Sequence, residues 1–114
     1  MSPPRRELSE FRGVWLLAMF DLPVYDKKAR RAYTRFRKLL LKEGFAMLQF
    51  SVYTRYFFSE EASQVHRARV QDGLPPEGNV RLLMVTDHQF GKMQVFYGKT
   101  ESPAEEAPEQ LLLF

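Results

Sequence analysis

A run of seven apolar residues near the start of the chain, Val14 to Phe20, constrains the fold more than any other feature. The run is too short to span a membrane, and it lacks the polar–apolar alternation of a half-exposed strand. We therefore predict a central β-strand that is covered on both faces. Asp21 follows directly, which places a carboxylate at the rim of the sheet on rigid backbone and makes it the first candidate for a functional residue. The structural alternative is a cap within the Asp21-Leu22-Pro23 bend.

The size and composition of the chain fit one globular domain. Its 114 residues include 45% hydrophobic residues, ten Phe and five Tyr, which is enough for a single core. The absence of cysteine excludes disulfides, zinc–thiolate sites and thiol catalysis. No apolar stretch reaches the length of a membrane span and no cleavable leader is visible, so we expect a cytoplasmic protein without a membrane partner.

The charge is distributed unevenly along the chain. Residues 1–58 carry twelve Lys or Arg against five acids, a net charge of +7, whereas residues 59–114 carry five against nine, a net charge of −4. A basic half joined to an acidic half indicates a surface for a polyanion and a tail that avoids it, while a solubilising charge pattern is the equally weighted alternative.

A helix over Lys27–Glu43 is the clearest prediction. Its apolar residues recur at helical spacing, Asp26 is placed to cap its first turn, and Gly44 suits the left-handed position just past its end. The residues of the apolar face are Ala29, Ala32, Tyr33, Phe36, Leu39 and Leu40.

The other face of this helix is strongly basic. Eight cations lie on it with no interleaved acid, so they repel one another unless an anion is near. Contact with nucleic-acid phosphates is favoured over a merely solvated face. The candidates for phosphate contact are Lys27, Lys28, Arg30, Arg31, Arg35, Arg37 and Lys38, and Lys42 is the eighth cation.

The rest of the chain predicts three strands, a second helix and a short fifth strand. Phe45–Phe58 is rich in aromatic and β-branched residues but too long for one strand, so we expect a break near Gln49–Ser51. The order strand, helix, strand, strand, helix, strand is that of an α+β, ferredoxin-like βαββαβ fold with both helices on one face. The later elements are a helix from Ser59 to Gly73, a strand over Asn79–Thr86 and a short strand over Met93–Tyr97.

The ends of the chain are predicted to lie outside this fold. We expect a flexible N-terminal arm over residues 1–10, a domain over 11–98 and an acidic flexible tail over 99–114 with an apolar end, Leu111–Phe114. The fifth strand has no place in a four-stranded sheet, and an exposed sheet edge of a partner subunit would accept it.

Several other side chains are secondary candidates. Asp87 and His88 follow the fourth strand and are typical of turn chemistry, and His66 is expected at the surface or partly buried. Tyr53, Arg55 and Phe57 are expected on the open face of the sheet, buried at a dimer interface, with stacking on bases as the alternative.

Three segments of the sequence resemble a known family. They are Met19–Val24 (MFDLPV), Gly44–Tyr53 (GFAMLQFSVY) and Leu74–Arg81 (LPPEGNVR), and they occur in the order found in the small CRISPR-associated adaptation proteins called Cas two. The resemblance covers about residues 11–98, and the forms of the first two segments resemble the branch found with type II systems.

The resemblance implies a ferredoxin-like homodimer whose C-terminal strands are exchanged between subunits. It further implies assembly with the CRISPR integrase, Cas one in words, to capture duplex DNA and insert it as a new spacer. Members of the family are known as metal-dependent endonucleases that act on single-stranded RNA or duplex DNA. Only one catalytic position carries over, the aspartate that ends the first strand, here Asp21.

Phosphodiester hydrolysis with one carboxylate per chain requires a metal ion. Mg²⁺ takes oxygen ligands and is often held by one or two carboxylates plus substrate phosphate, so two copies of Asp21 across a twofold axis would complete a site. Two functions remain open on the sequence: a Mg²⁺-dependent endonuclease that uses Asp21, and a DNA-binding scaffold of the integrase complex that does not cleave. A stand-alone RNA-binding domain is the more remote alternative, since its aromatic signature is missing from the strands.

Overall fold

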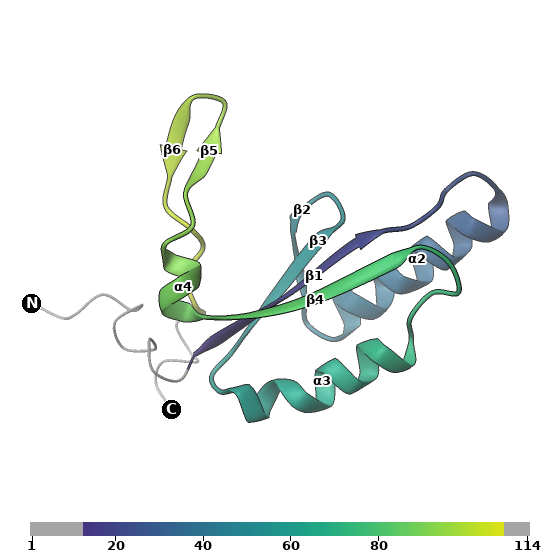
Figure 1. Cartoon of the computed structure of the whole chain (residues 1–114), viewed down its shortest axis with the longest axis horizontal. Helices are drawn as coiled ribbons and strands as arrows, with labels where there is room; N and C mark the ends of the chain where they lie inside the picture. Colours follow the sequence, from purple (N-terminus) through teal and green to yellow (C-terminus); the bar gives the residue numbers. More distant parts are fainter. Residues whose placement is uncertain (1–12, 109–114) are drawn as a thin grey trace, which may run out of the picture.

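A computed structural model of the chain describes residues 13–108, and Figure 1 shows a four-stranded sheet with two long helices against one face and a separate hairpin. The sheet has the strand order β2-β3-β1-β4. The elements are β1 (Val14–Asp21), α2 (Lys27–Lys42), β2 (Ala46–Gln49), β3 (Val52–Phe57), α3 (Glu60–Asp72), β4 (Asn79–Thr86), α4 (Asp87–Gly91), β5 (Val95–Tyr97) and β6 (Thr100–Ser102).

Strand β1 lies inside the sheet, as its continuous apolar sequence predicts. It pairs antiparallel with β3 on one side and with β4 on the other, with Leu16 opposite Arg55 and Met84. Both faces of the strand are largely buried. The element order and this pairing are those of the ferredoxin-like α+β fold, which confirms the predicted fold class.

One face of the sheet packs against α2 and α3. Leu16 and Phe20 of β1 contact Phe36 and Leu40 of α2 and Val70 of α3 in a single buried cluster. Burial of each such side chain stabilises the fold by about 1.5–3 kcal/mol. This core fixes α2 beneath the sheet and leaves the opposite side of the helix in solvent.

The ends of α2 follow the predicted capping chemistry. The carboxylate of Asp26 accepts a 2.7 Å hydrogen bond from the backbone N–H of Ala29, and Gly44 adopts a φ of 83° just beyond the helix. The helix itself ends at Lys42, one residue before the predicted end, and Glu43 is its C-cap.

The predicted break in Phe45–Phe58 is confirmed. Strands β2 and β3 are joined through Phe50 and Ser51, and Ser51 turns the chain with a φ of 63°. Because side chains alternate between the two faces of a sheet, this turn decides which residues of β3 face the helices.

The structure corrects the expected placement of Tyr53, Arg55 and Phe57. Tyr53 and Phe57 are buried in the core beneath the helices, and Arg55 bonds there to the backbone oxygen of Glu43. Tyr53 and Phe57 are therefore buried, and Arg55 half-buried, within one chain, on the side of the sheet away from the open face. The two faces of β3 are both rich in apolar residues, so the sequence pattern alone does not distinguish them.

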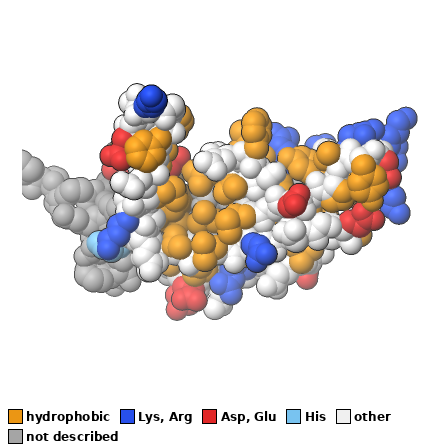
Figure 2. Space-filling view, turned by 45° about the horizontal axis from the view of Figure 1, so that its top comes forward, with side chains coloured by type: hydrophobic (Ala, Val, Ile, Leu, Met, Phe, Trp, Pro, Cys, Tyr) orange, Lys and Arg blue, Asp and Glu red, His pale blue; other side chains and the backbone are white. Residues whose placement is uncertain are grey.

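The face of the sheet opposite the long helices is only partly covered. A second buried cluster joins Trp15, Leu17 and Tyr56 with Phe90 of α4 and with Ala104 and Ala107 near the end of the described chain. This cover lies over one end of the sheet, and Leu83 farther along the same face remains 47% exposed. Figure 2 shows the resulting apolar surface beside the hairpin.

The part of the predicted tail that the structure describes is folded. β6 pairs with β5 in a two-stranded hairpin, and Ala104 and Ala107 are buried. The expectation of a flexible segment was therefore incorrect for residues 100–107, because two alanines with little side-chain entropy to lose pack against Trp15 and Phe90. The predicted arm over 1–10 and the apolar end Leu111–Phe114 lie outside the described residues.

No helix within residues 13–108 is long and apolar enough to cross a membrane.

Candidate nucleic-acid interface and acidic rim

Asp21 lies at the rim of the open sheet face. It is the last residue of β1, it is exposed, and it is paired in register with Asn79 of β4. Since Phe20 points into the core beneath the helices, strand alternation directs Asp21 to the opposite face, together with Leu17 and Met19. The carboxylate thus stands on rigid backbone at an accessible position.

The backbone around Asp21 is held by two neighbouring segments. The N–H of Phe20 donates a 3.0 Å hydrogen bond to the carbonyl of Ser51 in the β2–β3 turn. On the other side, Gly78 approaches so closely that an added Cβ would come within 2.5 Å of the Asp21 carbonyl oxygen. The φ of Gly78 is 86°, so this position requires glycine on both counts. Its close approach holds the loop before β4 against the end of β1.

Within residues 13–108 the Asp21 side chain makes no hydrogen bond or ion pair. The alternative of a cap for the Asp21-Leu22-Pro23 bend therefore finds no support. An exposed carboxylate without a structural partner is available to a ligand.

A single copy of the described chain offers too few ligands for a metal ion. No group of three or more His, Asp or Glu side chains within residues 13–108 is arranged to hold one. Asp21 alone fits Mg²⁺ only if further oxygen ligands come from water, from substrate or from a second chain.

The seven predicted phosphate-contacting residues are all exposed on α2. Lys27, Arg31 and Arg35 recur four residues apart, so they form one row along the helix. Figure 2 shows Lys and Arg side chains gathered at the end of the molecule where α2 begins. The remaining predicted residues are Lys28, Arg30, Arg37 and Lys38.

Part of this basic surface forms a shallow groove. Lys27, Arg30, Arg31, Thr34 and Arg35 line it, and no acidic side chain does. Arg30 also donates a 3.3 Å hydrogen bond to the carbonyl of Val24, which steadies its guanidinium over the first turn. Such a groove has the charge and the shape to follow a phosphate backbone.

Arg37 does not line this groove and instead bonds to a core residue. Its Nε donates a 2.8 Å hydrogen bond to the hydroxyl of Tyr53, whose ring is buried in the core. Arg37 therefore contributes to packing as well as to charge, whereas Lys38 lies exposed farther along the helix.

A charged cluster between α2, α3 and β3 was not predicted from the sequence. The Nδ1 of His66 lies 2.8 Å from a carboxylate oxygen of Glu43, and a guanidinium nitrogen of Arg69 lies 3.3 Å from the same oxygen. The hydrogen bond with His66, and then that with Arg69, lowers the pKa of the Glu43 carboxyl despite its burial. Burial lowers the pKa of Arg55, and the nearby charge of Glu43 opposes that shift.

This cluster serves the fold. Glu43 is almost fully buried at the end of α2, and it joins His66 and Arg69 of α3 to Arg55 of β3. His66 is half-buried, in agreement with the sequence expectation. The sequence gives no signal for this charged cluster, because helical pairing rules apply to residues three or four apart and Glu43 and His66 are 23 positions apart.

The secondary acidic candidates are structural as well. Asp26 caps α2, and Asp87 begins α4, where its carboxylate accepts a 2.6 Å hydrogen bond from the indole N–H of Trp15. Thr86 and Gln89 form a reciprocal capping box around the same turn. A five-residue helix thus replaces the turn expected at Asp87 and His88.

Comparison with known proteins agrees with this architecture. The family model for "CRISPR associated protein Cas2" matches residues 14–93, from the start of β1 to just before β5. A protein of Parvibaculum lavamentivorans named "CRISPR-associated endoribonuclease Cas2" is 50% identical over 101 residues, which cover 89% of this chain and 100% of that protein.

Two more distant relatives carry the same name. The protein of Flavobacterium psychrophilum is 42% identical over 94% of this chain and 93% of its own length. That of Streptococcus mutans is 37% identical over 85% of this chain and 91% of its own length. The match extends over nearly the whole length of each protein and includes β1, α2 and the acidic rim, so the chain belongs to the CRISPR associated protein Cas2 family.

Proposed function

We propose that this protein is a subunit of the CRISPR adaptation machinery that forms a homodimer and holds duplex DNA along α2, together with the CRISPR integrase. The observation that carries the proposal is the row of exposed cations on α2, since no acidic side chain lines the groove that they form. The membership of the chain in a family named for its association with CRISPR supports the same conclusion. Such a row contacts phosphates without reading sequence, as spacer capture requires.

The open sheet face supports pairing with a second copy. Leu83 is 47% exposed there, and Phe96 and Tyr97 of the hairpin are 55% and 69% exposed. Contiguous apolar surface beside an unpaired strand edge, here β4, marks an interaction site. In the proposed dimer the two open faces meet, and the β5 strand of each chain adds to the β4 edge of the other.

Dimerisation would also complete an acidic site. Asp21 lies on the open face, so a twofold axis through that face brings the two copies of Asp21 toward each other. Two carboxylates and substrate phosphate match the oxygen ligands that Mg²⁺ takes, so the pair of aspartates would hold the ion. When bound, Mg²⁺ supplies an activated water and charge neutralisation for phosphodiester hydrolysis.

The contributions of the protein to that hydrolysis are positional. The aspartates sit on strand ends braced by Ser51 and Gly78, and the α2 cations hold the phosphates on either side. The relatives are named endoribonucleases, so single-stranded RNA is a substrate class to test beside duplex DNA.

A non-catalytic scaffold is the second candidate. It is favoured by the lack of a three-ligand cluster in residues 13–108. The RNA-binding alternative is weakened because the aromatic residues on this face of β1 and β3, Trp15 and Tyr56, are buried against Phe90, Ala104 and Ala107 and cannot stack on bases.

The decisive experiment compares Asp21→Ala with the double variant Arg31→Ala/Arg35→Ala in two assays, spacer acquisition in cells and Mg²⁺-dependent cleavage by the purified protein. We expect the arginine variant to lose acquisition through weakened DNA binding. We expect Asp21→Ala to lose cleavage, and retained acquisition by this variant would identify the scaffold as the biological role. Unchanged cleavage by Asp21→Ala would contradict the site assignment.

A further inference from the structure

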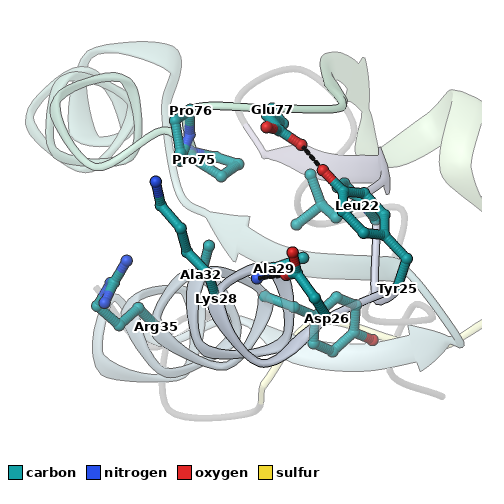
Figure 3. A pocket seen from close by; sticks show the side chains of 12 residues that line it. Leu22, Tyr25, Asp26, Lys28, Ala29, Ala32, Arg35, Pro75, Pro76 and Glu77 are labelled. Atoms are coloured by element: carbon teal, nitrogen blue, oxygen red, sulfur yellow. Dashed lines mark hydrogen bonds between the residues drawn. The ribbon is translucent and has the colours of Figure 1, made fainter.

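A second hollow lies beside the basic groove, between the start of α2 and the loop that leads into β4. We call it the proline slot, because Pro75 and Pro76 form one wall and Ala32 of α2 lies in the other. Figure 3 shows Lys28 rising from the helix toward the prolines and Tyr25 closing the end of the slot. The slot shares Arg35 with the phosphate row, and it does not include Asp21 of the acidic rim.

Cations line one side of the slot and a carboxylate its closed end; the carboxylate of Asp26 also lines the slot, where it caps α2 by accepting a hydrogen bond from the backbone N–H of Ala29. Lys28 and Arg35 stand on the α2 side, while the hydroxyl of Tyr25 donates a 2.5 Å hydrogen bond to the carboxylate of Glu77 at the closed end. This bond raises the pKa of Tyr25, so the hydroxyl stays protonated and keeps the two side chains joined. A carboxylate has further lone pairs, so Glu77 can still accept hydrogen bonds from a ligand.

The size of the slot limits what enters. Its volume is about 220 Å³, below the roughly 300 Å³ at the lower end for pockets that hold drug-sized ligands. A single planar base fits between the prolines and the alanine side of the helix, whereas a drug-sized ligand does not.

We propose that the proline slot binds a single unpaired nucleotide of the nucleic acid that lies along α2, with its base between Pro75 and Ala32 and its phosphate on Lys28 and Arg35. A nucleotide carries an anion at one end and N–H donors at the other, which is the arrangement that Lys28 and Glu77 complement. An acidic peptide would be repelled by the Glu77 carboxylate.

The slot is continuous with the basic groove. Arg35 lines both hollows, and Lys27, Arg30 and Arg31 line only the groove. A strand whose phosphates follow the groove therefore reaches the slot at Arg35. A base paired within a duplex is held in the stack, so an unpaired nucleotide enters at lower cost.

This inference rests on the proposed binding of DNA along α2, and the experiment separates the two. Affinity of the full-length protein is measured for three duplexes: one blunt, one with a single unpaired adenine nucleotide at its end, and one with an abasic nucleotide there. The abasic duplex has the same phosphates as the adenine duplex. Stacking of a base on an aromatic side chain contributes about 1–3 kcal/mol. Because proline and alanine offer no aromatic face, we use the lower end of this range and expect the adenine duplex to bind about fivefold more tightly than the abasic one.

Two matched pairs of variants locate the effect. Ala32→Leu fills the slot and is expected to abolish the adenine preference, whereas Thr34→Leu, which alters only the groove, retains it. Lys28→Ala is expected to reduce the preference, while Lys27→Ala, with the same change of charge on the same turn, weakens all three duplexes equally. Thermal unfolding of each variant checks that the fold is intact.

Equal affinity for the adenine and abasic duplexes overturns the inference and leaves the proposed function standing. If Ala32→Leu instead weakens binding of the integrase subunit and leaves the adenine preference intact, the slot is a protein-docking site and the inference is also wrong. Failure of all three duplexes to bind contradicts the proposed function. In that case the proline slot is tested by itself, by NMR titration of the protein with adenosine monophosphate. Shifts of amide resonances centred on Lys28 and Ala32 support nucleotide binding in the slot, and the absence of such shifts overturns the inference.

Discussion

The indole nitrogen of Trp15 donates a 2.6 Å hydrogen bond to the buried carboxylate of Asp87, across 72 residues of sequence. The same indole stacks on Phe90, with ring centroids 4.1 Å apart and planes inclined by 10°. These contacts join the start of β1 to α4, and α4 directs the chain into the β5–β6 hairpin. The position of the hairpin beside the open sheet face therefore depends on this pair.

Replacing Asp87 tests that dependence. Asp87→Ala leaves the buried indole N–H without its acceptor, and we expect a loss of about 1–3 kcal/mol in the free energy of unfolding. Asp87→Asn keeps an acceptor oxygen and is expected to lose less. Chemical denaturation measures both, and equal stability of the wild type and Asp87→Ala would contradict the structural role of this bond.

The fold was largely predictable because its main elements carry strong local patterns. The apolar run ending at Asp21 predicts a buried strand, and the apolar spacing between Ala29 and Leu40, with Asp26 before it, predicts the helix and its cap. These signals act within one element, so no knowledge of tertiary contacts was needed.

The remaining features depend on contacts between distant residues. The turn at Ser51 determines that Tyr53 and Phe57 point toward the helices. Packing of Ala104 and Ala107 against Trp15 keeps residues 104–107 folded. The helix α4 could have been found from the capping pair Thr86 and Gln89, but it is only five residues long. Asp21 was a candidate from its position at the end of the buried run, but only the family resemblance favoured a functional role over a cap within the bend, since a lone carboxylate at a bend has no distinctive spacing.

The charged cluster around Glu43 predicts a pH dependence of stability. Its pKa in the folded chain lies below the ordinary value of 4.5, so the unfolded chain binds more protons as the pH falls below that value. The stabilisation is therefore fully present above about pH 4.5 and is lost as the pH falls through the lower, folded pKa.

The variant Glu43→Gln removes this ionisation. We expect it to be less stable than the wild type at neutral pH by roughly 1–2 kcal/mol, with the difference shrinking in acid. Denaturation midpoints measured from pH 7 to pH 3 check this, and His66→Gln is a control that removes the first partner of the carboxylate. A stability difference that stays constant across the range would contradict the account.

The basic groove predicts a steep dependence of duplex affinity on salt. Arg31→Ala/Arg35→Ala removes two cations that line the groove, so the negative slope of log affinity against log salt should become shallower by roughly 1.8. Filter binding or anisotropy at several salt concentrations measures this slope.

The control for that measurement is Lys92→Ala/Lys99→Ala, which removes the same charge from exposed residues outside α2. We expect a nearly unchanged slope for it. Equal slopes for the two double variants would place the DNA elsewhere on the protein.

The open sheet face predicts that a charge at Leu83 breaks the dimer. Leu83→Asp puts a carboxylate on the proposed apolar interface, whereas Val65→Asp puts one on α3, where Val65 is 50% exposed. Light scattering should give a monomer for the first variant and a dimer for the second. A dimeric Leu83→Asp would show that the chains pair through another surface.

In the dimer that we propose, two chains meet through the open sheet face with their Asp21 residues opposite each other. The chain contains no cysteine, so Asp21→Cys introduces a single thiol at this position, and Val65→Cys provides a control on α3. Each variant is treated with a short thiol-to-thiol cross-linker and run on a denaturing gel. We expect a covalent dimer from Asp21→Cys and a monomer from Val65→Cys; a dimer in solution whose Asp21→Cys variant gives no cross-linked product would contradict the claim.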